Sequence, residues 1–218
     1  MCAKGLPEDF ASSTTMENSD FDPIYQNQNI ESKIVASLER IAQAFRVLLW
    51  QESKDLTLTP TQIQVLIFLY HHHGDQRKVS YLAKEFNMSK ATVSDTVKAL
   101  VQKELITKEY DKMDTRSYRI HLTESGRLMA ERVSLFSKEI RSPLSHYTSI
   151  EKEQMLAGLM GIIRHLNQVG VISMQRMCLN CLYYQPGDES STFYCRLLNE
   201  SLPASSLRID CPEHVPVA

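Results

Sequence analysis

Cysteine is missing from the long middle of this sequence: none occurs between Cys2 and Cys178, and four then fall within the last part of the 218-residue chain. Common enzyme signatures are missing as well, since the chain has no glycine-rich phosphate loop, no H-E-x-x-H and no G-x-S-x-G. These absences argue against a nucleotide-dependent enzyme, a zinc protease and a serine hydrolase. We therefore expect a protein that is not an enzyme.

Long apolar runs are also lacking. No stretch approaches the roughly 18 apolar residues that a membrane-spanning helix needs, and the first residues do not have the basic start and apolar core of a secretory signal peptide. We expect a cytoplasmic protein without a membrane partner. Because disulfides are rare in that compartment, a cysteine cluster there more often indicates metal or redox chemistry.

The chain has no overall positive charge. Its formal net charge is −2, so any nucleic-acid binding depends on a local basic face. Such a face is indicated between residues 75 and 119, where ten Lys or Arg stand against seven Asp or Glu. By contrast, residues 1–22 carry one Lys against five acids, and residues 1–29 have few aliphatic side chains, which predicts a flexible acidic leader.

Apolar residues recur at helical spacing from Ile30 onward. The pattern predicts a long amphipathic helix that ends near residue 50. A second helix is predicted after it, with Thr59 as its N-cap and Pro60 at its first position. Three adjacent histidines, residues 71–73, end this helix; since neighbours on a helix point about 100° apart, we expect them to interact with the helix dipole rather than to share one metal ion.

Two shorter helices, over residues 80–86 and 89–105, are joined by the tight turn NMS and predict a helix-turn-helix. The second of them has an apolar face, made by Val93, Val97, Leu100 and Val101. A β-hairpin is predicted next, because ITKEY and SYRIHLT flank the polar DKMDTR. Two more helices should follow, one capped by Thr123 and interrupted by Pro143, the other stopped by Gly170.

The polar side of the 89–105 helix suits a DNA major groove, which admits one helix and is usually contacted by that helix's N-terminal half. Hydroxyl groups there can bond bases or phosphate, amines can bind phosphate or guanine, and a methyl can touch thymine. The candidates on this helix are Ser89, Lys90, Ala91, Thr92, Ser94, Asp95 and Lys98. The alternative is an ordinary solvated face, which the tight turn before the helix and the hairpin after it disfavour.

The segments LTPTQIQVLIFLY and SYLAKEFNMSKATVSDTVKALVQKELITKEYDKMDTRSYRIHLTESG together resemble the winged-helix core of the MarR family of bacterial transcription regulators. The matching elements are Leu82–Ala83, Ser89, Thr92–Ser94, Leu100, Leu105–Ile106, the D-x-R of Asp114–Arg116, and the L-T-x-x-G of Leu122–Gly126. The resemblance covers about residues 30–170. It implies an obligate homodimer with interlocking first and last helices, whose recognition helices and wings bind double-stranded DNA.

The resemblance also implies roles at the wing. Arg116 is expected near the minor groove with Asp114 orienting it, and Lys112 is a further candidate DNA contact beside them. Two positions depart from the family pattern: Asp95 stands where a basic residue is common, and Glu104 where a glycine usually precedes Leu-Ile. Many relatives bind small aromatic effectors, but no residue pattern in this sequence indicates such a pocket.

Residues 171–218 form an appended cysteine-rich module with the spacing Cys178-x2-Cys181-x13-Cys195-x15-Cys211. The close pair suits Zn²⁺ or an iron–sulfur cluster, and a predicted hairpin returns Cys195 to that pair. A four-thiolate zinc site is the favoured interpretation, an iron–sulfur cluster is the alternative, and free or disulfide-forming thiols are a third. His214 could replace one ligand, whereas Cys2 should not take part.

The expected fold is thus mainly α, a winged helix-turn-helix with a small β-hairpin wing, a helical dimerisation region and a metal-binding tail. The expected function is a homodimeric, sequence-specific DNA-binding transcription regulator that represses by blocking polymerase and responds to metal or redox state. The alternative function is a winged-helix protein-interaction module whose metal-bound tail docks a partner.

Overall fold

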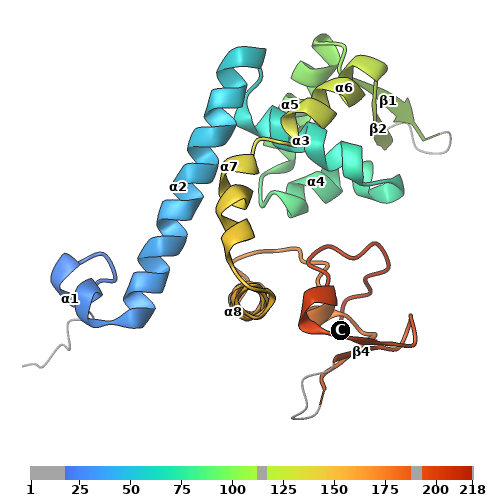
Figure 1. Cartoon of the computed structure of the whole chain (residues 1–218). Helices are drawn as coiled ribbons and strands as arrows, with labels where there is room; N and C mark the ends of the chain where they lie inside the picture. Colours follow the sequence, from blue (N-terminus) through green and yellow to red (C-terminus); the bar gives the residue numbers. More distant parts are fainter. Residues whose placement is uncertain (1–17, 112–116, 188–192, 218) are drawn as a thin grey trace, which may run out of the picture. The chain divides into compact units, whose positions relative to one another are not determined.

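The computed structural model describes residues 18–111, 117–187 and 193–217. The chain divides into two compact units, Met1–Val47 and Leu48–Ala218. It is mainly helical and carries two small antiparallel sheets, as the sequence predicts (Figure 1). Among the described residues, none of the helices is both long enough and apolar enough to cross a membrane.

The elements follow one another along the chain in a regular order. The α-helices are α1 (Pro23–Gln28), α2 (Ile30–Leu56), α3 (Pro60–His71), α4 (Val79–Glu85), α5 (Lys90–Gln102), α6 (Glu124–Val133), α7 (Lys138–Arg141) and α8 (Ser149–Gln168). The short 3-10 helices are η1 (Gly74–Arg77), η2 (Ser142–His146), η3 (Cys178–Asn180) and η4 (Ala204–Ser206). The strands are β1 (Ile106–Tyr110), β2 (Tyr118–Leu122), β3 (Tyr184–Gln185), β4 (Phe193–Cys195) and β5 (Glu200–Leu202).

The first unit contains α1 and the N-terminal part of α2. The side chain of Asp22 caps α1 by accepting from the Ile24 N–H, and Pro23 occupies the first helical position. The buried hydroxyl of Ser32 donates to Asp20 at 2.7 Å. The last part of the leader predicted for residues 1–29 thus contains a short helix, which an N-cap and a proline start.

The core of the second unit forms around α3, which packs against α5, α6 and β2. A capping box starts this helix as predicted, with Thr59 and Gln62 exchanging hydrogen bonds of 3.2 Å. Its buried side chains are Gln62, Ile63, Val65, Leu66, Phe68 and Leu69. The guanidinium of Arg77 donates at 2.6 Å to the carbonyls of Leu69 and His72, which satisfies backbone groups at the C-terminal end of α3.

The helix-turn-helix and its wing lie where the sequence predicts them. The turn between α4 and α5 places Asn87 at φ +51°, a left-handed conformation that asparagine tolerates. Ser89 caps α5 by accepting from the Thr92 N–H at 3.0 Å. Strands β1 and β2 pair in antiparallel register from Ile106 opposite Leu122 to Tyr110 opposite Tyr118. Glu104, just before β1, has φ +58°, a left-handed conformation that favours glycine.

Two helix boundaries differ from the prediction. Helix α2 runs on to Leu56 instead of ending near residue 50, because the added residues QESKDL include good helix formers and lack Gly and Pro. Helix α6 ends at Val133, well before Pro143, since the backbone tightens into turns that bring Phe136 against the core. The chain then continues through α7 and η2.

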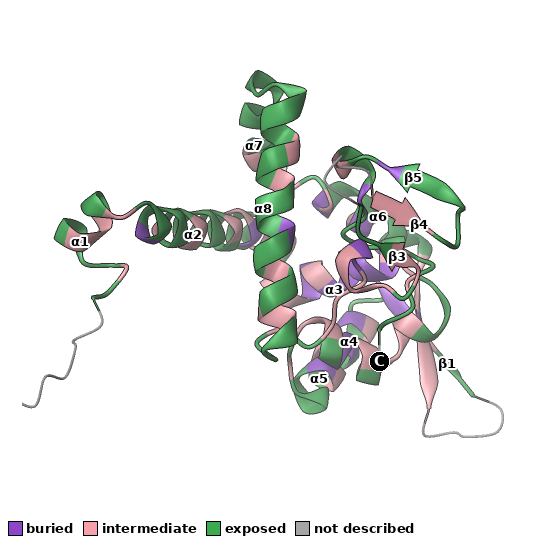
Figure 2. Cartoon of the chain, turned by 90° about the horizontal axis from the view of Figure 1, so that it is seen from below, coloured by how far each residue is buried: buried purple, intermediate pink, exposed green. Residues whose placement is uncertain are grey.

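The last helix supports the cysteine-rich tail. A capping box between Thr148 and Glu151 starts α8, and Gly170 follows it at φ +78°. Met160 of α8 is fully buried in a second, smaller core with Met177, Cys178, Leu202 and Leu207. The predicted hairpin is present as β3 and β4, and β5 adds a third strand that the sequence did not indicate. Figure 2 shows buried residues gathered around α3–α5 and in the tail, while α8 is mainly exposed.

Candidate nucleic-acid interface and four-cysteine pocket

Helix α5 presents the predicted polar face to solvent. Val93, Val97 and Leu100 are completely buried, so the orientation of the helix about its own axis is fixed. The opposite side exposes Ser89, Lys90, Ala91, Thr92, Asp95 and Lys98, with Ser94 half-buried beside them. A helix held this firmly by its apolar face can offer its N-terminal turns to a groove without losing packing.

Contacts within this face restrain two of its polar groups. The Lys98 ammonium lies 3.1 Å from the Asp95 carboxylate, one turn earlier on the helix. Both side chains are largely exposed, so the pair contributes little to stability. It does hold the ammonium over α5, and it offsets one positive charge. The Thr92 hydroxyl bonds that of Ser89 at 2.8 Å, which keeps both near the start of the helix.

The wing is tied to η1 by charge. Asp75 lies 2.9 Å from Arg119 of β2 and 3.0 Å from Lys78. The hydrogen bond from Lys78, and then that from Arg119, lower the pKa of Asp75 below its ordinary value. Lys108 stacks over the Tyr118 ring at 4.7 Å on the facing strands. The wing's base is therefore braced, whereas the predicted wing contacts Lys112, Asp114 and Arg116 lie outside the described residues.

Several basic residues of the 75–119 segment serve the fold. Arg77 caps the end of α3. Lys103 donates to the Thr57 carbonyl and to Gln62. Arg119 pairs with Asp75. Fewer positive charges are therefore available to a ligand than a count of residues suggests. On α5 the available amines are those of Lys90 and Lys98, and the charge of Lys98 is partly offset by Asp95.

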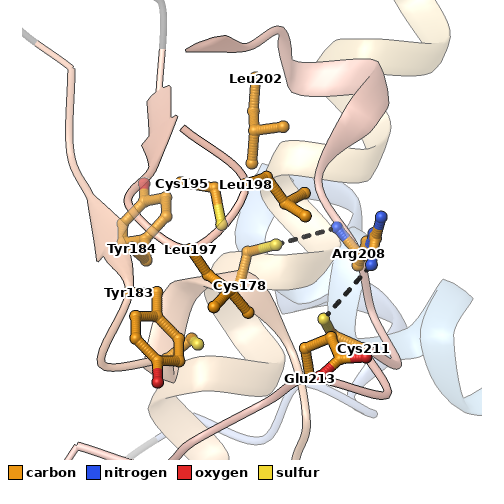
Figure 3. A pocket seen from close by; sticks show the side chains of 11 residues that line it. Cys178, Tyr183, Tyr184, Cys195, Leu197, Leu198, Leu202, Arg208, Cys211 and Glu213 are labelled. Atoms are coloured by element: carbon orange, nitrogen blue, oxygen red, sulfur yellow. Dashed lines mark hydrogen bonds between the residues drawn. The ribbon is translucent and has the colours of Figure 1, made fainter. Parts of the chain in front are cut away.

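The four cysteines of the tail line a single pocket, together with tyrosine and leucine side chains (Figure 3). Cys178 begins η3, Cys181 follows it, Cys195 ends β4, and Cys211 lies in the loop after η4. All four are free thiols. In Figure 3 the sulfur atoms of Cys178, Cys195 and Cys211 turn toward the same space. The tail fold therefore brings together the four residues that the sequence singles out.

Backbone pairing explains this convergence. The Cys178 N–H donates to the Arg208 carbonyl, and the Cys211 N–H to the Arg176 carbonyl, both at 2.9 Å. Cys195 lies opposite Tyr184 in the small sheet. These bonds place the loop that carries Cys211 beside η3, although 30 or more residues separate them in sequence.

Arg208 contributes to the pocket from the loop before Cys211. Its N–H donates to the Cys178 sulfur at 3.2 Å, and its guanidinium lies 3.6 Å from the Cys211 sulfur. Burial raises the pKa of Cys178, while the bond from Arg208 opposes that rise. The hydrogen bond to Cys211 raises the pKa of Arg208. Arg208 thus supplies both donors and positive charge to a cluster of thiols.

From the sequence, His214 is a candidate replacement metal ligand, and Cys2 is excluded from the site. His214 bonds the Asn180 carbonyl through its Nε2 atom at 3.1 Å and is not among the residues that line the pocket. Cys2 lies outside the described residues. Within the described part of the chain, no three His, Cys, Asp or Glu side chains are arranged to hold a single metal ion.

A buried arginine joins the tail to the helix-turn-helix. The Arg176 side chain is only 10% exposed, and it lies 2.6 Å from Glu85 of α4 and 2.6 Å from Asp210. It also donates to the Tyr81 hydroxyl at 2.9 Å. Burial disfavours the charge, but the hydrogen bonds to Asp210 and Glu85 outweigh this effect and raise the pKa of Arg176. Sequence reasoning missed this group, because its members are scattered along the chain and none forms a motif.

His72 extends the same network. Its ring stacks on Phe68 with 3.8 Å between centroids, and its nitrogens lie 2.9 Å from the Phe68 carbonyl oxygen and 2.8 Å from the Asp210 carboxylate. His72, one of the three adjacent histidines, therefore bonds a residue far from it in sequence, the Asp210 carboxylate of the tail. Hydrogen bonds from Asn87 to the Val171 carbonyl and from Ser173 to the Lys84 carbonyl add to this contact.

The winged-helix part of the chain is similar to known proteins. The model of the MarR family matches residues 56–117. Two structures of MepR from S. aureus, one a complex with DNA and one in its DNA-binding conformation, are each 28% identical to this chain with a TM-score of 0.54. They cover 61% of this chain and 97% and 98% of their own. A MarR transcriptional regulator from Methanosarcina mazei Go1, 18% identical over 62% of this chain and 97% of its own, shows the same fold with a TM-score of 0.54.

Proposed function

We propose that this chain is a MarR-family transcription regulator that binds double-stranded DNA sequence-specifically and acts in the cytoplasm, most simply as a repressor that blocks polymerase. The main support for this proposal is that the polar face of the N-terminal half of α5 is exposed, while the opposite face of the helix is buried. The family match over residues 56–117 and the likeness to MepR bound to DNA support the same function.

We also propose that the active form is a homodimer. In α8, Met160 packs against the chain's own tail, so this side of the helix is not available to a second copy. Met155, Leu159 and Ile162 still form an exposed row with spacings of four and three residues. Helix α2 likewise exposes Ile34 and Ile41, seven residues apart. Exposed apolar rows on two long helices are typical of a surface that another subunit covers.

A series of contacts connects the cysteine-rich tail to the helix-turn-helix, and through it the metal or redox state of the cysteines could affect DNA binding. The tail that carries the four cysteines is bonded to α4 through Arg176, and α4 packs directly against α5. A change in how well the tail is ordered would therefore alter the contacts of α4, the first helix of the helix-turn-helix. We propose that the state of the cysteine pocket adjusts the position or stability of α4 and, through it, DNA affinity.

The test is retention of genomic DNA fragments by the purified full-length protein, with the region upstream of its own gene included, followed by mobility-shift titration of the enriched fragments. We expect a small set of fragments to be enriched over random DNA and to bind more tightly than a scrambled sequence of equal length. Absence of any enrichment, even at low salt, would contradict DNA regulation and would leave the protein-interaction function as the surviving account.

A further inference from the structure

The space between the four tail cysteines is the least explained feature of the molecule. It is a cavity of about 20 Å³ lined by the four cysteines, by leucine and tyrosine side chains, and by the charged residues Arg208 and Glu213. A buried water needs about 10–15 Å³ and several polar partners. Protein interiors are normally packed to crystal density, so a cavity lined by four free cysteines suggests a ligand that their thiols bind.

A single zinc ion does not fit this arrangement well. Zinc binds thiolates at about 2.3 Å in a tetrahedron, which brings the four sulfurs to about 3.8 Å from one another and leaves no space between them. Here no three candidate ligand side chains in the described residues are arranged around one ion position. The four cysteines line a cavity, and their side chains do not converge on one ion position.

We propose that Cys178, Cys181, Cys195 and Cys211 bind one [4Fe–4S] cluster, with one thiolate on each iron. Such a cluster is held by four cysteines, and its inorganic core fills the space between their sulfurs. The four thiols lose their protons on binding, and the thiolates replace other ligands on the four irons. The inference concerns the tail alone and does not depend on whether the helix-turn-helix binds DNA.

The surroundings of the cysteines suit a cluster. The wall of the pocket includes the buried side chain of Leu202 and the half-buried ring of Tyr184, which limit access of water to the irons. The Arg208 N–H and guanidinium reach two of the sulfurs, and hydrogen bonds of this kind stabilise thiolate ligands and tune a cluster's potential. Zinc sites can share such donors, so the donors support thiolate ligation and the cavity discriminates between the two ligands.

The small apolar core of the tail also favours a bound ligand that stabilises its fold. Among the residues that the structure describes, the buried apolar side chains of the tail core are, apart from Met160 of α8, Met177, Cys178, Leu202 and Leu207, and the strands β3, β4 and β5 are two or three residues long. A segment of this size seldom gains enough free energy from apolar burial alone and is usually stabilised by disulfides or a metal centre. The four thiols are free, and a metal centre bound by them would add to the stability that the tail gains by packing on α8.

The deciding experiment is analysis of wild-type full-length protein, purified without oxygen and then supplied with equal amounts of ferrous and ferric iron and with inorganic sulfide. We expect about four iron atoms and four acid-labile sulfides per chain, the count that defines the proposed cluster. A broad visible absorption that bleaches on reduction should accompany them. One zinc per chain without sulfide, two irons with two sulfides, or no bound metal would each overturn the proposal.

Variants then locate the cluster. Cys195→Ser should lose most of the iron and sulfide, whereas Cys2→Ser should keep wild-type amounts. Circular dichroism of both variants reports whether the helices are retained, so that loss of iron from a folded Cys195→Ser protein is distinguishable from misfolding. Equal cluster content in Cys195→Ser and wild type would overturn the assignment of ligands, and loss of the cluster in Cys2→Ser would do the same.

Discussion

Gly126 lies so close to the start of the wing that a Cβ atom at this position would stand 1.8 Å from the carbonyl oxygen of Leu105. That oxygen accepts from the Thr123 N–H at 3.1 Å, so it cannot move away without breaking the cap region of α6. We expect Gly126→Ala to lower the free energy of unfolding by about 2–3 kcal/mol.

Gly158 provides the matched control. It lies in α8, where an added Cβ would meet no atom within 4 Å. Gly158→Ala should therefore stabilise by about 0.5–1 kcal/mol through the lower backbone entropy of the unfolded chain. Chemical denaturation of both variants measures the difference; equal stabilities would show that α6 does not need its close approach to β1.

Features at the residue scale were predictable where their cause is local. Thr59, Ser89 and Thr123 each cap the helix predicted for them, because capping depends only on the next three residues. Arg176 was not predictable, since its partners are Glu85, 91 residues before it, and Asp210, 34 residues after it. These ion pairs form only when the tail is folded against α4, so the sequence alone does not indicate them.

At the scale of elements, the contact between the tail and α4 depends on Arg176. Removing this side chain leaves the Glu85 carboxylate, 20% exposed, without its charged partner. We expect Arg176→Gln to cost about 2–3 kcal/mol, below the usual cost of breaking a fully buried pair because Asp210 is 43% exposed. The tail should also be cut faster in limited proteolysis.

Arg127→Gln is the control for this change. Arg127 pairs with Glu124 at 2.9 Å, but both side chains are largely exposed, so its loss should cost less than about 1 kcal/mol. Thermal unfolding and proteolysis of the two variants are compared side by side. If Arg176→Gln behaved like Arg127→Gln, the tail would not be held by this ion pair, and the proposed route to α4 through Arg176 would be contradicted.

The ion pair between Arg176 and Asp210 should weaken in acid. The hydrogen bond from Arg176, with a smaller contribution from His72, lowers the pKa of Asp210 below its ordinary value of 3.8. A group whose pKa is lowered by folding stabilises the protein above its unfolded pKa and loses that contribution as pH falls through the folded value. The contact should therefore persist at neutral pH and weaken only below about pH 4.

Elements of regular length were predicted better than short ones. The long helices, the helix-turn-helix and the wing follow from periodicity and caps. Strand β5 and helix α7, with three and four residues, carry too little pattern to be recognised. The spacing of the cysteines predicts a shared site, but it does not predict the cavity between them, since the cavity depends on how η3, the end of β4 and the loop after η4 pack.

At the scale of the whole molecule, the homodimer is tested through Leu159, which is 37% exposed in the apolar row of α8. A charge in the middle of a covered interface is costly to bury. Leu159→Glu should therefore shift the protein toward monomer in analytical ultracentrifugation and weaken DNA binding with it. Leu128→Glu, at a leucine 55% exposed on α6, should leave the dimer intact. A dimer unaffected by Leu159→Glu would place the interface elsewhere.

The claim that α5 binds DNA is tested most directly by the salt dependence of affinity for an enriched fragment. Each phosphate contact contributes about 0.9 to the slope of log K against log salt concentration. If Lys98 makes one such contact, Lys98→Gln should reduce the slope by about that amount, while Lys138→Gln, at an exposed lysine on α7, should leave it unchanged. Identical slopes for wild type and Lys98→Gln would contradict the assignment of α5 as the DNA-contacting helix.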